Sequence, residues 1–353
     1  MTRNLIDLND FTIDEWEEII QLAKDIQQNP AKYQDYCKRK IMATLFYEPS
    51  TRTQMSFQTA MYRLGGEVIG FDNPVNTSVA KGESLKDTIK IISGYADLIV
   101  MRHPLEGAAK AASEFSNCPV INAGDGGHLH PTQTLTDLLT LYEEKGKING
   151  LVIGICGDLK NGRTVHSLVK ALMCYENTSF VFISTPTLTL PDYLKNLLDQ
   201  SGCRYVEMKE LSNAMPIIDV LYMTRIQRER FDSEIEYQSQ KNIYILDNEK
   251  LISAKNDLKI LHPLPRVDEI DIAVDEDERA IYFKQAIYGV YARTALIIKM
   301  LEKNKEDKSP DVTSLTKRCV NPKCITNPEK YLKNSFYDSN GVYRCLYCDH
   351  EIR

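Results

Sequence analysis

Short apolar runs alternate with amphipathic segments along roughly the first 300 residues of the chain. The runs favour strands, and the segments between them repeat apolar residues every three or four positions, as helices do. The first segment begins at a capping box, because Thr12 and Glu15 stand three residues apart before an apolar stripe. The predicted strands are 40–48, 67–71, 97–102, 120–122, 151–158, 180–185, 205–208, 219–224, 242–247 and 258–262. The predicted helices are one that begins at 13, then 50–64, 84–95, 107–115, 132–144, 163–174, 191–200 and 283–302.

This alternation of strands and helices is typical of parallel sheets covered by helices on both faces. Because the pattern restarts at 151, we expect two doubly wound α/β domains of about 140 residues each. Residues 303–318 are polar, contain a proline and have no apolar face, which predicts an exposed linker. The last 35 residues, 319–353, are too few to bury a core of their own.

Composition excludes several classes of protein but does not name a function. The 353 residues are 43% hydrophobic and 26% charged, with a net charge of −6, so a basic footprint for nucleic acid is absent. No apolar stretch reaches the ~18 residues of a membrane span, and the N-terminus lacks the apolar run of a secretory signal. Without such a signal, the nine cysteines predict thiols in the reducing cytoplasm rather than disulfides.

The segment YEPSTRT (47–53) joins a predicted strand to a predicted helix. Ser50, Thr51, Arg52 and Thr53 therefore stand at a helix N-terminus, where unpaired N–H groups and a partial positive charge favour an anion. On physical grounds alone, a plain Ser/Thr cap beside an exposed arginine explains these residues about equally well.

The longer string FYEPSTRTQMSF (46–57) resembles the phosphate-binding signature of the aspartate and ornithine transcarbamylases, which transfer a carbamoyl group from carbamoyl phosphate to an amine. The resemblance covers essentially residues 1–302, and its blocks occur in the order of the family. The further blocks are NTSVAKGESLKDTI (76–89), VMRHP (100–104), NAGDGGHLHPTQTLTD (122–137), GDLKNGRTVHSL (157–168), TRIQRER (224–230) and HPLPRVDEI (262–270).

The resemblance implies which residues bind carbamoyl phosphate. His130 would donate to the carbonyl oxygen, where negative charge builds in the tetrahedral intermediate. Taken alone, His130 in its Gly-rich loop also fits a buried structural histidine. The backbone carbonyls of Leu264 and Pro265, joined by a cis bond in the family, would contact the carbamoyl amino group. The ligands implied are Ser50, Thr51, Arg52, Thr53, Ser78, Lys81, Arg102, His130, Gln133, Leu264 and Pro265.

Lys81 and Ser78 belong to a polar loop, 73–84, in which a lysine is otherwise simply solvated. In the family this loop reaches into the active site of the neighbouring subunit, and its lysine meets both substrates. The resemblance therefore implies a homotrimer with active sites shared between neighbouring chains. Ser78 has the weaker support, because the spacing between serine and lysine varies in this loop.

The second domain must recognise the amine acceptor. Aspartate carries two carboxylates, which favour two separate guanidinium groups. Arg163, which begins a helix, and Arg225, which ends a strand, match the aspartate ligands of the family, with Gln227 as a supporting contact. HPLPR (262–266) stands where an ornithine enzyme would carry HCLP, so L-aspartate is the expected acceptor.

The resemblance implies direct attack of the aspartate amine on the carbamoyl carbon, with phosphate leaving a tetrahedral intermediate and no organic cofactor. The product, N-carbamoyl-L-aspartate, would enter pyrimidine biosynthesis. The implied domains are 1–131, completed by the helix 288–302, for carbamoyl phosphate, and 132–287 for aspartate. The polar segment 226–242 is the expected mobile lid.

Four of the nine cysteines form two close pairs in the tail, Cys319 with Cys324 and Cys345 with Cys348. Two short cysteine spacings on a small polar module are typical of a closed, structural zinc site, which predicts one zinc ion per chain. Disulfides or unligated thiols are the alternatives, and His350 is a competing ligand.

The tail, RCVNPKCITNPEKYL…VYRCLYCDHEI, resembles the zinc domain of the aspartate transcarbamylase regulatory chain, here fused to the catalytic sequence. We expect a small zinc-ribbon-like β domain that clamps onto its own or a neighbouring catalytic chain. Because the nucleotide-binding domain of the regulatory chain is missing, we expect no control by CTP or ATP in cis. A separate regulatory protein remains open as a further partner.

Three other functions fit parts of the sequence. The first is a transcarbamylase with a different amine acceptor. The second is a zinc-ribbon protein that binds nucleic acid, although residues 317–353 carry only seven Lys and Arg against four Asp and Glu. The third is an inactive scaffold, which the full set of site residues argues against. Neither nucleic acid nor a membrane is an expected partner.

Overall fold

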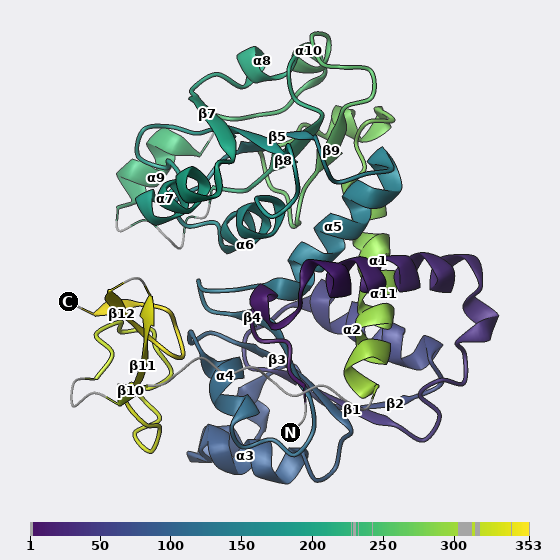
Figure 1. Ribbon diagram of the computed structural model, residues 1–353, viewed down its shortest axis with the longest axis vertical. Coiled ribbons are helices and arrows are strands. Elements are labelled where there is room, and N and C mark those ends of the chain that lie inside the picture. Colours follow the sequence, from purple (N-terminus) through teal and green to yellow (C-terminus); the bar gives the residue numbers. More distant parts are fainter. Residues whose placement is uncertain are drawn as a thin grey trace. The chain divides into compact units, whose positions relative to one another are not determined.

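The structure, a computed structural model, describes residues 3–226, 228, 231, 233–241, 243–302, 313–314, 318–339 and 341–352 (Figure 1). The chain divides into two compact units. Unit 1 comprises Met1–Leu135 and Val290–Arg353, and unit 2 comprises Thr136–Gly289. Helices α5 (Pro131–Lys145) and α11 (Tyr282–Leu301) each run from one unit into the other along the chain.

Unit 1 contains a parallel sheet with the strand order β2-β1-β3-β4. Its helices include α1, which begins at the capping box of Thr12 and Glu15 as predicted. The strands are β1 (Ile41–Phe46), β2 (Glu67–Phe71), β3 (Leu98–His103) and β4 (Val120–Asp125). The helices are α1 (Ile13–Gln28), α2 (Thr51–Arg63), α3 (Leu85–Ile92) and α4 (Ala108–Ser113), with 3-10 turns η1 (Leu8–Asp10), η2 (Pro30–Lys32), η3 (Pro74–Asn76) and η4 (Ser78–Lys81).

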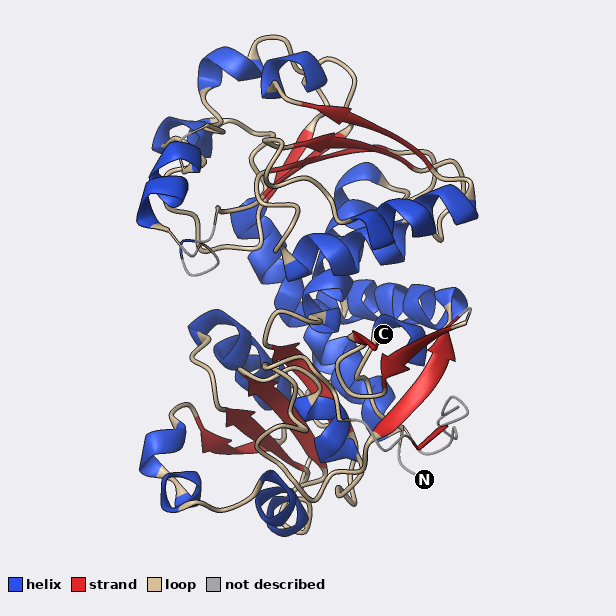
Figure 2. Cartoon of the chain, turned by 90° about the vertical axis from the view of Figure 1, so that its left-hand side faces the viewer, coloured by secondary structure: helices blue, strands red, loops and turns tan. Residues whose placement is uncertain are grey.

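Unit 2 contains a parallel sheet with the strand order β7-β6-β5-β8-β9. Figure 2 shows this sheet with helices packed around it. The strands are β5 (Val152–Cys156), β6 (Ser179–Ile183), β7 (Arg204–Met208), β8 (Val220–Met223) and β9 (Lys259–Leu261). The helices are α6 (Arg163–Leu172), α7 (Asp192–Ser201), α8 (Leu211–Ala214), α9 (Glu234–Gln240) and α10 (Asn248–Leu251), with the 3-10 turn η6 (Ile272–Glu276).

The predicted fold class is confirmed, because both sheets are parallel and doubly wound. One predicted strand, 242–247, is wrong. Leu246 forms only a single bridge to Ile270, and no ladder develops around it. Tyr244 and Leu246 instead bury their side chains in the core of unit 2. A short apolar run does not distinguish a paired strand from a segment that is buried without pairing.

The C-terminal tail forms a small antiparallel sheet with the order β10-β11-β12-β13, as expected of a small β domain. The strands are β10 (Thr313–Ser314), β11 (Ser335–Ser339), β12 (Val342–Cys345) and β13 (Glu351–Ile352). The sheet therefore begins inside the segment predicted as a linker. The other parts of that segment, 303–312 and 315–317, lie outside the described residues.

The tail shares its core with the sheet of its own unit 1. Phe336, Ile325 and Tyr347 belong to one buried cluster with Leu45 and Met101 of the sheet, and helices α3 and α4 add to it. The tail obtains in this way the apolar burial that 35 residues do not supply alone. None of the helices in the described part of the chain combines the length and the apolar character that a membrane span requires.

Candidate active site and metal centre

The strand order of unit 1 reverses between β1 and β3, and the predicted phosphate ligands lie at that point. Helix α2 follows the carboxyl end of β1, and Arg102 lies at the carboxyl end of β3. The strands are adjacent, because Phe46 pairs with Arg102 and the Tyr47 N–H donates to the Arg102 carbonyl over 2.8 Å. Ligands of doubly wound sheets bind in the crevice at such a reversal.

The N-terminus of α2 is available to an anion. Ser50 is the N-cap residue, but its hydroxyl makes no capping hydrogen bond to the first turn. Thr51 and Arg52 are exposed on that turn, and Thr53 is buried. The backbone N–H groups of the turn are therefore not taken up by the cap side chain, which favours an anion site over a plain Ser cap.

Arg102 is held in place before any ligand arrives. Its guanidinium Nε lies 3.2 Å from Glu48 Oε2, and only 11% of its side chain is exposed. Glu48 precedes the turn at the start of α2, so the ion pair joins the two arginine-bearing segments of the site. Glu48 balances one of the two guanidinium charges of Arg52 and Arg102, and a phosphate bound here would compensate the other.

His130 follows β4 and stands directly before α5, at the same edge of the sheet as Arg102. Its imidazole is buried, and its Nδ1 lies 3.4 Å from the Thr132 hydroxyl. In the tautomer in which the Thr132 hydroxyl donates to Nδ1, the ring proton stands on Nε2 and Nε2–H is a donor. The Gln133 N–H donates to the His130 carbonyl, which places Gln133 in the first turn beside it.

Lys81 and Ser78 form the two ends of the turn η4, and both side chains are exposed. Gly82, which follows with φ +91°, ends the turn in the left-handed conformation and has open space around it. The loop therefore presents Lys81 at the surface.

Unit 2 repeats the arrangement at the reversal between β5 and β8. The loops after these two strands touch, because the Thr224 N–H donates to the Cys156 carbonyl over 2.8 Å. Gly157 has φ +123°, and a Cβ there would stand 2.3 Å from the Thr224 carbonyl oxygen. Only glycine allows this close approach, which aligns the two loops that lead to the predicted aspartate ligands.

Both predicted arginines lie at this edge of unit 2. Arg163 begins α6, with Gly162 as its N-cap, and Arg225 follows β8 by two residues. Both side chains are half-buried. Gln227 lies outside the described residues, and so do parts of the predicted lid 226–242, in which α9 is formed.

The segment after β9 completes the edge of unit 2. The Leu264–Pro265 bond is cis, which confirms that prediction. His262 fixes the turn, because its Nδ1 accepts the Leu264 N–H over 2.8 Å and its Nε2–H donates to Glu269 over 2.7 Å. Burial raises the pKa of Glu269, but the interactions with His262 and the hydrogen bonds from backbone N–H groups together outweigh it and hold that pKa below its ordinary value.

The four predicted metal ligands converge in the tail. The sulfur atoms of Cys319, Cys324, Cys345 and Cys348 all lie within 4.8 Å of one another and are buried, and His350 is not part of this group. The Cys319–Cys348 sulfurs are 3.6 Å apart and the Cys324–Cys345 sulfurs 3.8 Å apart. Four thiolates at ~2.3 Å from one tetrahedral zinc ion stand about 3.8 Å apart, so the donor set fits the ion.

Two polar side chains support the sulfurs. The Thr326 hydroxyl donates to Cys324 Sγ over 3.2 Å, and the Asn321 amide lies 3.6 Å from Cys348 Sγ. The pKa of the Cys324 thiol is lowered, because the three other thiols can donate to its thiolate. A site closed by four buried sulfurs suits a structural metal.

The prediction from sequence missed Asp125 and His128, which lie in the Gly-rich loop ahead of His130. Asp125 is 1% exposed and accepts hydrogen bonds from the N–H groups of Gly107 and Leu129. His128 joins Asp125 to Asp349, a residue of the tail. No local pattern signals this, because 221 positions separate His128 from Asp349.

Three family models match consecutive parts of the chain. They are the aspartate/ornithine carbamoyltransferase carbamoyl-P binding domain over residues 3–143, its Asp/Orn binding domain over 149–300, and the metal binding domain of the aspartate carbamoyltransferase regulatory chain over 312–353. The predicted resemblance of both the catalytic part and the tail is confirmed.

Individual relatives agree. The aspartate carbamoyltransferase catalytic subunit of Clostridium perfringens is 58% identical over 300 residues, which are 85% of this chain and 98% of that protein. The catalytic subunit of M. jannaschii aspartate transcarbamoylase matches with a TM-score of 0.80 and 48% identity, over 86% of this chain and all of that one. Aspartate transcarbamoylase from Trypanosoma cruzi in complex with carbamoyl phosphate and aspartate matches with a TM-score of 0.78 and 35% identity, over 84% and 95%.

Proposed function

Because this chain belongs to the aspartate/ornithine carbamoyltransferase family, we propose that it transfers the carbamoyl group of carbamoyl phosphate to L-aspartate. The products are N-carbamoyl-L-aspartate and phosphate, and the reaction serves pyrimidine biosynthesis. The observation that carries the proposal is the pair of strand-order reversals, each of which collects the arginines suited to one substrate.

Unit 1 binds the donor. The phosphate lies against the first turn of α2, where Ser50, Thr51, Arg52 and Thr53 surround the N–H groups, and Arg102 supplies the second guanidinium. His130 and Gln133 bind the carbamoyl group. We assign this role to residues 1–131 together with the helix 288–302.

Unit 2 binds the acceptor through residues 132–287. Arg163 and Arg225 lie on the loops of two adjacent strands and each receive one carboxylate of aspartate, with Gln227 as an additional contact. The carbonyls of Leu264 and Pro265 accept from the carbamoyl amino group. Ornithine carries a cationic side chain in place of the second carboxylate, so two arginines select against it.

The reaction needs no covalent enzyme intermediate. The deprotonated amine of aspartate attacks the carbamoyl carbon, and the electrons of the C=O bond move onto oxygen, where His130 Nε2–H donates. When the carbonyl re-forms, the bond to the phosphate oxygen breaks and phosphate leaves with that electron pair. The leaving phosphate takes the proton that the amine loses. The enzyme contributes orientation and charge stabilisation.

Lys81 supports a proposal about assembly. Its side chain is exposed on the turn η4 of the polar loop 73–84, where a neighbouring chain can reach it. We propose a homotrimer in which Lys81 and Ser78 of one chain complete the active site of the neighbouring chain. The enzyme would then be inactive as a monomer.

The metal is proposed to be zinc, one ion per chain, held by Cys319, Cys324, Cys345 and Cys348. Four thiolate donors at tetrahedral separations support this identity. When bound, the ion supplies structure rather than chemistry, because no coordination position remains for substrate. A site of reduced thiols also supports a cytoplasmic location.

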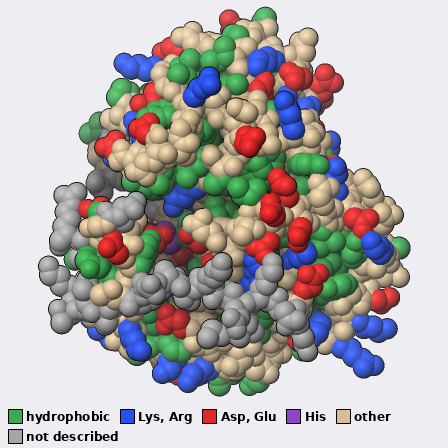
Figure 3. All heavy atoms as spheres, viewed as in Figure 1, with side chains coloured by type: hydrophobic (Ala, Val, Ile, Leu, Met, Phe, Trp, Pro, Cys, Tyr) green, Lys and Arg blue, Asp and Glu red, His purple; other side chains and the backbone are tan. Residues whose placement is uncertain are grey.

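Nucleic-acid binding by the tail has less support. Acidic and basic side chains are interspersed over the face of the molecule seen in Figure 3. The tail also turns its apolar side toward unit 1 rather than toward a partner molecule. Salt-dependent binding of DNA or RNA at a site that truncation near Lys303 removes would favour this alternative.

The test is identification of the product. The full chain is incubated with ¹³C-carbamoyl phosphate and ¹⁵N-aspartate, and NMR detects the new ¹³C–¹⁵N bond. We expect carbamoyl-aspartate to form and unlabelled ornithine in equal concentration to remain unreacted. Formation of citrulline, or release of phosphate without a carbamoylated amine, would show that the acceptor is wrongly assigned.

A further inference from the structure

The tail is fastened to unit 1 at the segment that follows β3. The Glu106 N–H donates to the Lys323 carbonyl, and the Ile325 N–H donates to the Glu106 carbonyl, each over 2.9 Å. The Asn321 amide adds a 2.6 Å hydrogen bond to the Glu106 carboxylate. These bonds surround the metal-ligating Cys324, so the fold of the metal centre and the position of the Glu106 segment are linked.

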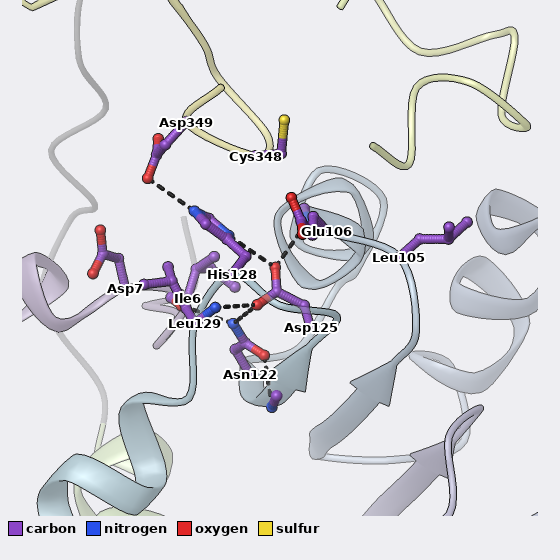
Figure 4. A network of polar contacts seen from close by, with 12 residues as sticks. Ile6, Asp7, Leu105, Glu106, Asn122, Asp125, His128, Leu129, Cys348 and Asp349 are labelled. Carbon is purple, nitrogen blue, oxygen red and sulfur yellow. Dashed lines mark hydrogen bonds and ion pairs between the residues drawn. The ribbon is translucent and has the colours of Figure 1, made fainter. Parts of the chain in front are cut away.

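A second fastening reaches the loop ahead of His130 (Figure 4). His128 lies between two carboxylates, with Nε2 at 2.9 Å from Asp349 of the tail and Nδ1 at 3.2 Å from Asp125. Its side chain is 13% exposed. Burial lowers the pKa of His128, but the negative charges of Asp125 and Asp349 outweigh it and raise the pKa well above its ordinary value.

Asp125 is the point at which both fastenings meet. One of its oxygens accepts the Gly107 N–H over 2.8 Å, next to Glu106, and faces His128. The other accepts the Leu129 N–H over 3.0 Å. The Asp125 N–H in turn donates to the Leu129 carbonyl, so residues 125–129 form a closed turn that ends immediately before His130.

Gly107 shows how closely the tail approaches this turn. Its φ is +80°, and a Cβ there would stand 2.5 Å from Cβ and from the carbonyl oxygen of Tyr347. The tail backbone thus lies against the residue whose N–H holds Asp125. Displacement of the tail would break the contact between His128 and Asp349 and would disturb the hydrogen bonds that Asp125 accepts.

We propose that His128 is a positioning residue for His130. It transmits the docked position of the tail, through Asp125 and the closed turn, to the imidazole that polarises the carbamoyl carbonyl. This inference rests on the role proposed above for His130. It gives the fused tail a share in the chemistry of its own chain.

The experiment is a double-mutant cycle on the full-length, metal-loaded enzyme. His128→Gln keeps a polar side chain but does not bridge two carboxylates, and His130→Ala removes the proposed donor. Asp349→Asn is a second variant, which removes the negative charge that the tail contributes to the bridge. Asparagine tolerates the φ of 55° at this position. Tyr347→Phe is the matched control, because it removes only the hydroxyl that bonds Glu114 and keeps the ring and the backbone that lies against Gly107.

We expect His128→Gln to lower kcat about tenfold, because small misplacements of a catalytic group are costly. The KM for carbamoyl phosphate should stay within about twofold, since the phosphate ligands lie on other strands. In the His130→Ala background the same substitution should change kcat by less than about twofold. Asp349→Asn should lower kcat by a smaller factor than His128→Gln, and Tyr347→Phe should keep wild-type kcat.

Three results would overturn the inference. Persistence of the tenfold loss in the His130→Ala background would mean that His128 acts through general stability. Tyr347→Phe could lose as much activity as His128→Gln, or both bridge variants could keep wild-type kcat. If His130→Ala itself leaves kcat unchanged, the proposed role of His130 fails first, so the two failures are distinguishable. Bound zinc per chain, measured on each variant, verifies that the tail remains folded.

Discussion

Unit 1 and unit 2 both collect functional side chains where the order of their parallel strands reverses, but they surround that point differently. In unit 1 the strand β1 runs into the N-terminus of α2, so backbone N–H groups and a single strand-end arginine, Arg102, face the site. In unit 2 two loops meet at Gly157 and each carries one arginine, Arg163 or Arg225.

The difference matches the charge of the two substrates. A phosphate concentrates about two negative charges on one group, which a ring of N–H donors surrounds. Aspartate separates its two carboxylates, which two guanidinium groups at a fixed spacing recognise. On the proposed assignment of the substrates, one topology serves a compact anion through a helix N-terminus with Arg52 and Arg102, and a divided anion through the side chains of two arginines. Only unit 1, moreover, includes the tail with its cluster of four cysteines.

Metal removal should have the largest effect, and it should destabilise part of unit 1 without affecting unit 2. Structural zinc contributes about 10–16 kcal/mol in small metal domains, and this tail has little core of its own. A chelator, or Cys345→Ser, should therefore abolish amide-exchange protection in β11 and β12. The residues of α3 and α4 that an unfolded tail would uncover should lose part of their protection, while β5 and β6 keep theirs. Equal loss in both units, or no loss in the tail, would contradict this.

His130→Ala should have the next largest effect. Loss of one donor to a developing oxyanion costs about 2.7–4 kcal/mol, which corresponds to roughly a 100- to 1,000-fold fall in kcat. Steady-state kinetics with both substrates saturating measures it. His350→Ala is the control, because His350 is an exposed histidine of the tail. It should keep both kcat and the zinc content, and a fall in either would assign His350 a role.

Arg225→Ala should affect the acceptor alone. A hydrogen bond to a charged group contributes about 1.5–3 kcal/mol, so the KM for aspartate should rise about 10- to 150-fold. The KM for carbamoyl phosphate should be unchanged. Arg204→Ala removes an exposed charge from the same unit, at the other end of its sheet, and should alter neither value. A rise in the KM for carbamoyl phosphate would contradict the assignment of the donor to unit 1 and the acceptor to unit 2.

The smallest effect should come from Asp275, whose carboxylate pairs with Arg266 in unit 2. Arg266 lowers the pKa of Asp275 below its model-compound value of 3.8. A depressed pKa stabilises the fold above the unfolded value, and that contribution disappears as pH falls through the folded pKa. Asp275→Asn should therefore cost about 1 kcal/mol of unfolding free energy at pH 7 and less at an acidic pH below 3.8. Urea unfolding at both pH values measures the difference, and an equal cost at both would exclude the ion pair as its cause.

The sequence predicts most of the site, because its chemistry is local. The string STRT, which contains Arg52, predicts a helix start. The spacing of the two cysteine pairs predicts a metal centre without any knowledge of the fold. The sequence does not predict that 242–247 is buried without pairing, since pairing depends on distant backbone. It does not predict the bridge from Asp349 through His128 to Asp125 either. That bridge joins parts of the chain that only the docked tail brings together.

The division of substrates between the units is most directly tested by calorimetric titration of carbamoyl phosphate, without aspartate, into the wild type, Arg102→Gln and Arg225→Gln. We expect Arg225→Gln to bind carbamoyl phosphate as the wild type does, and Arg102→Gln to bind it at least about tenfold more weakly. Equal weakening in both variants, or wild-type binding by Arg102→Gln, would contradict the assignment of the donor to unit 1 and the acceptor to unit 2.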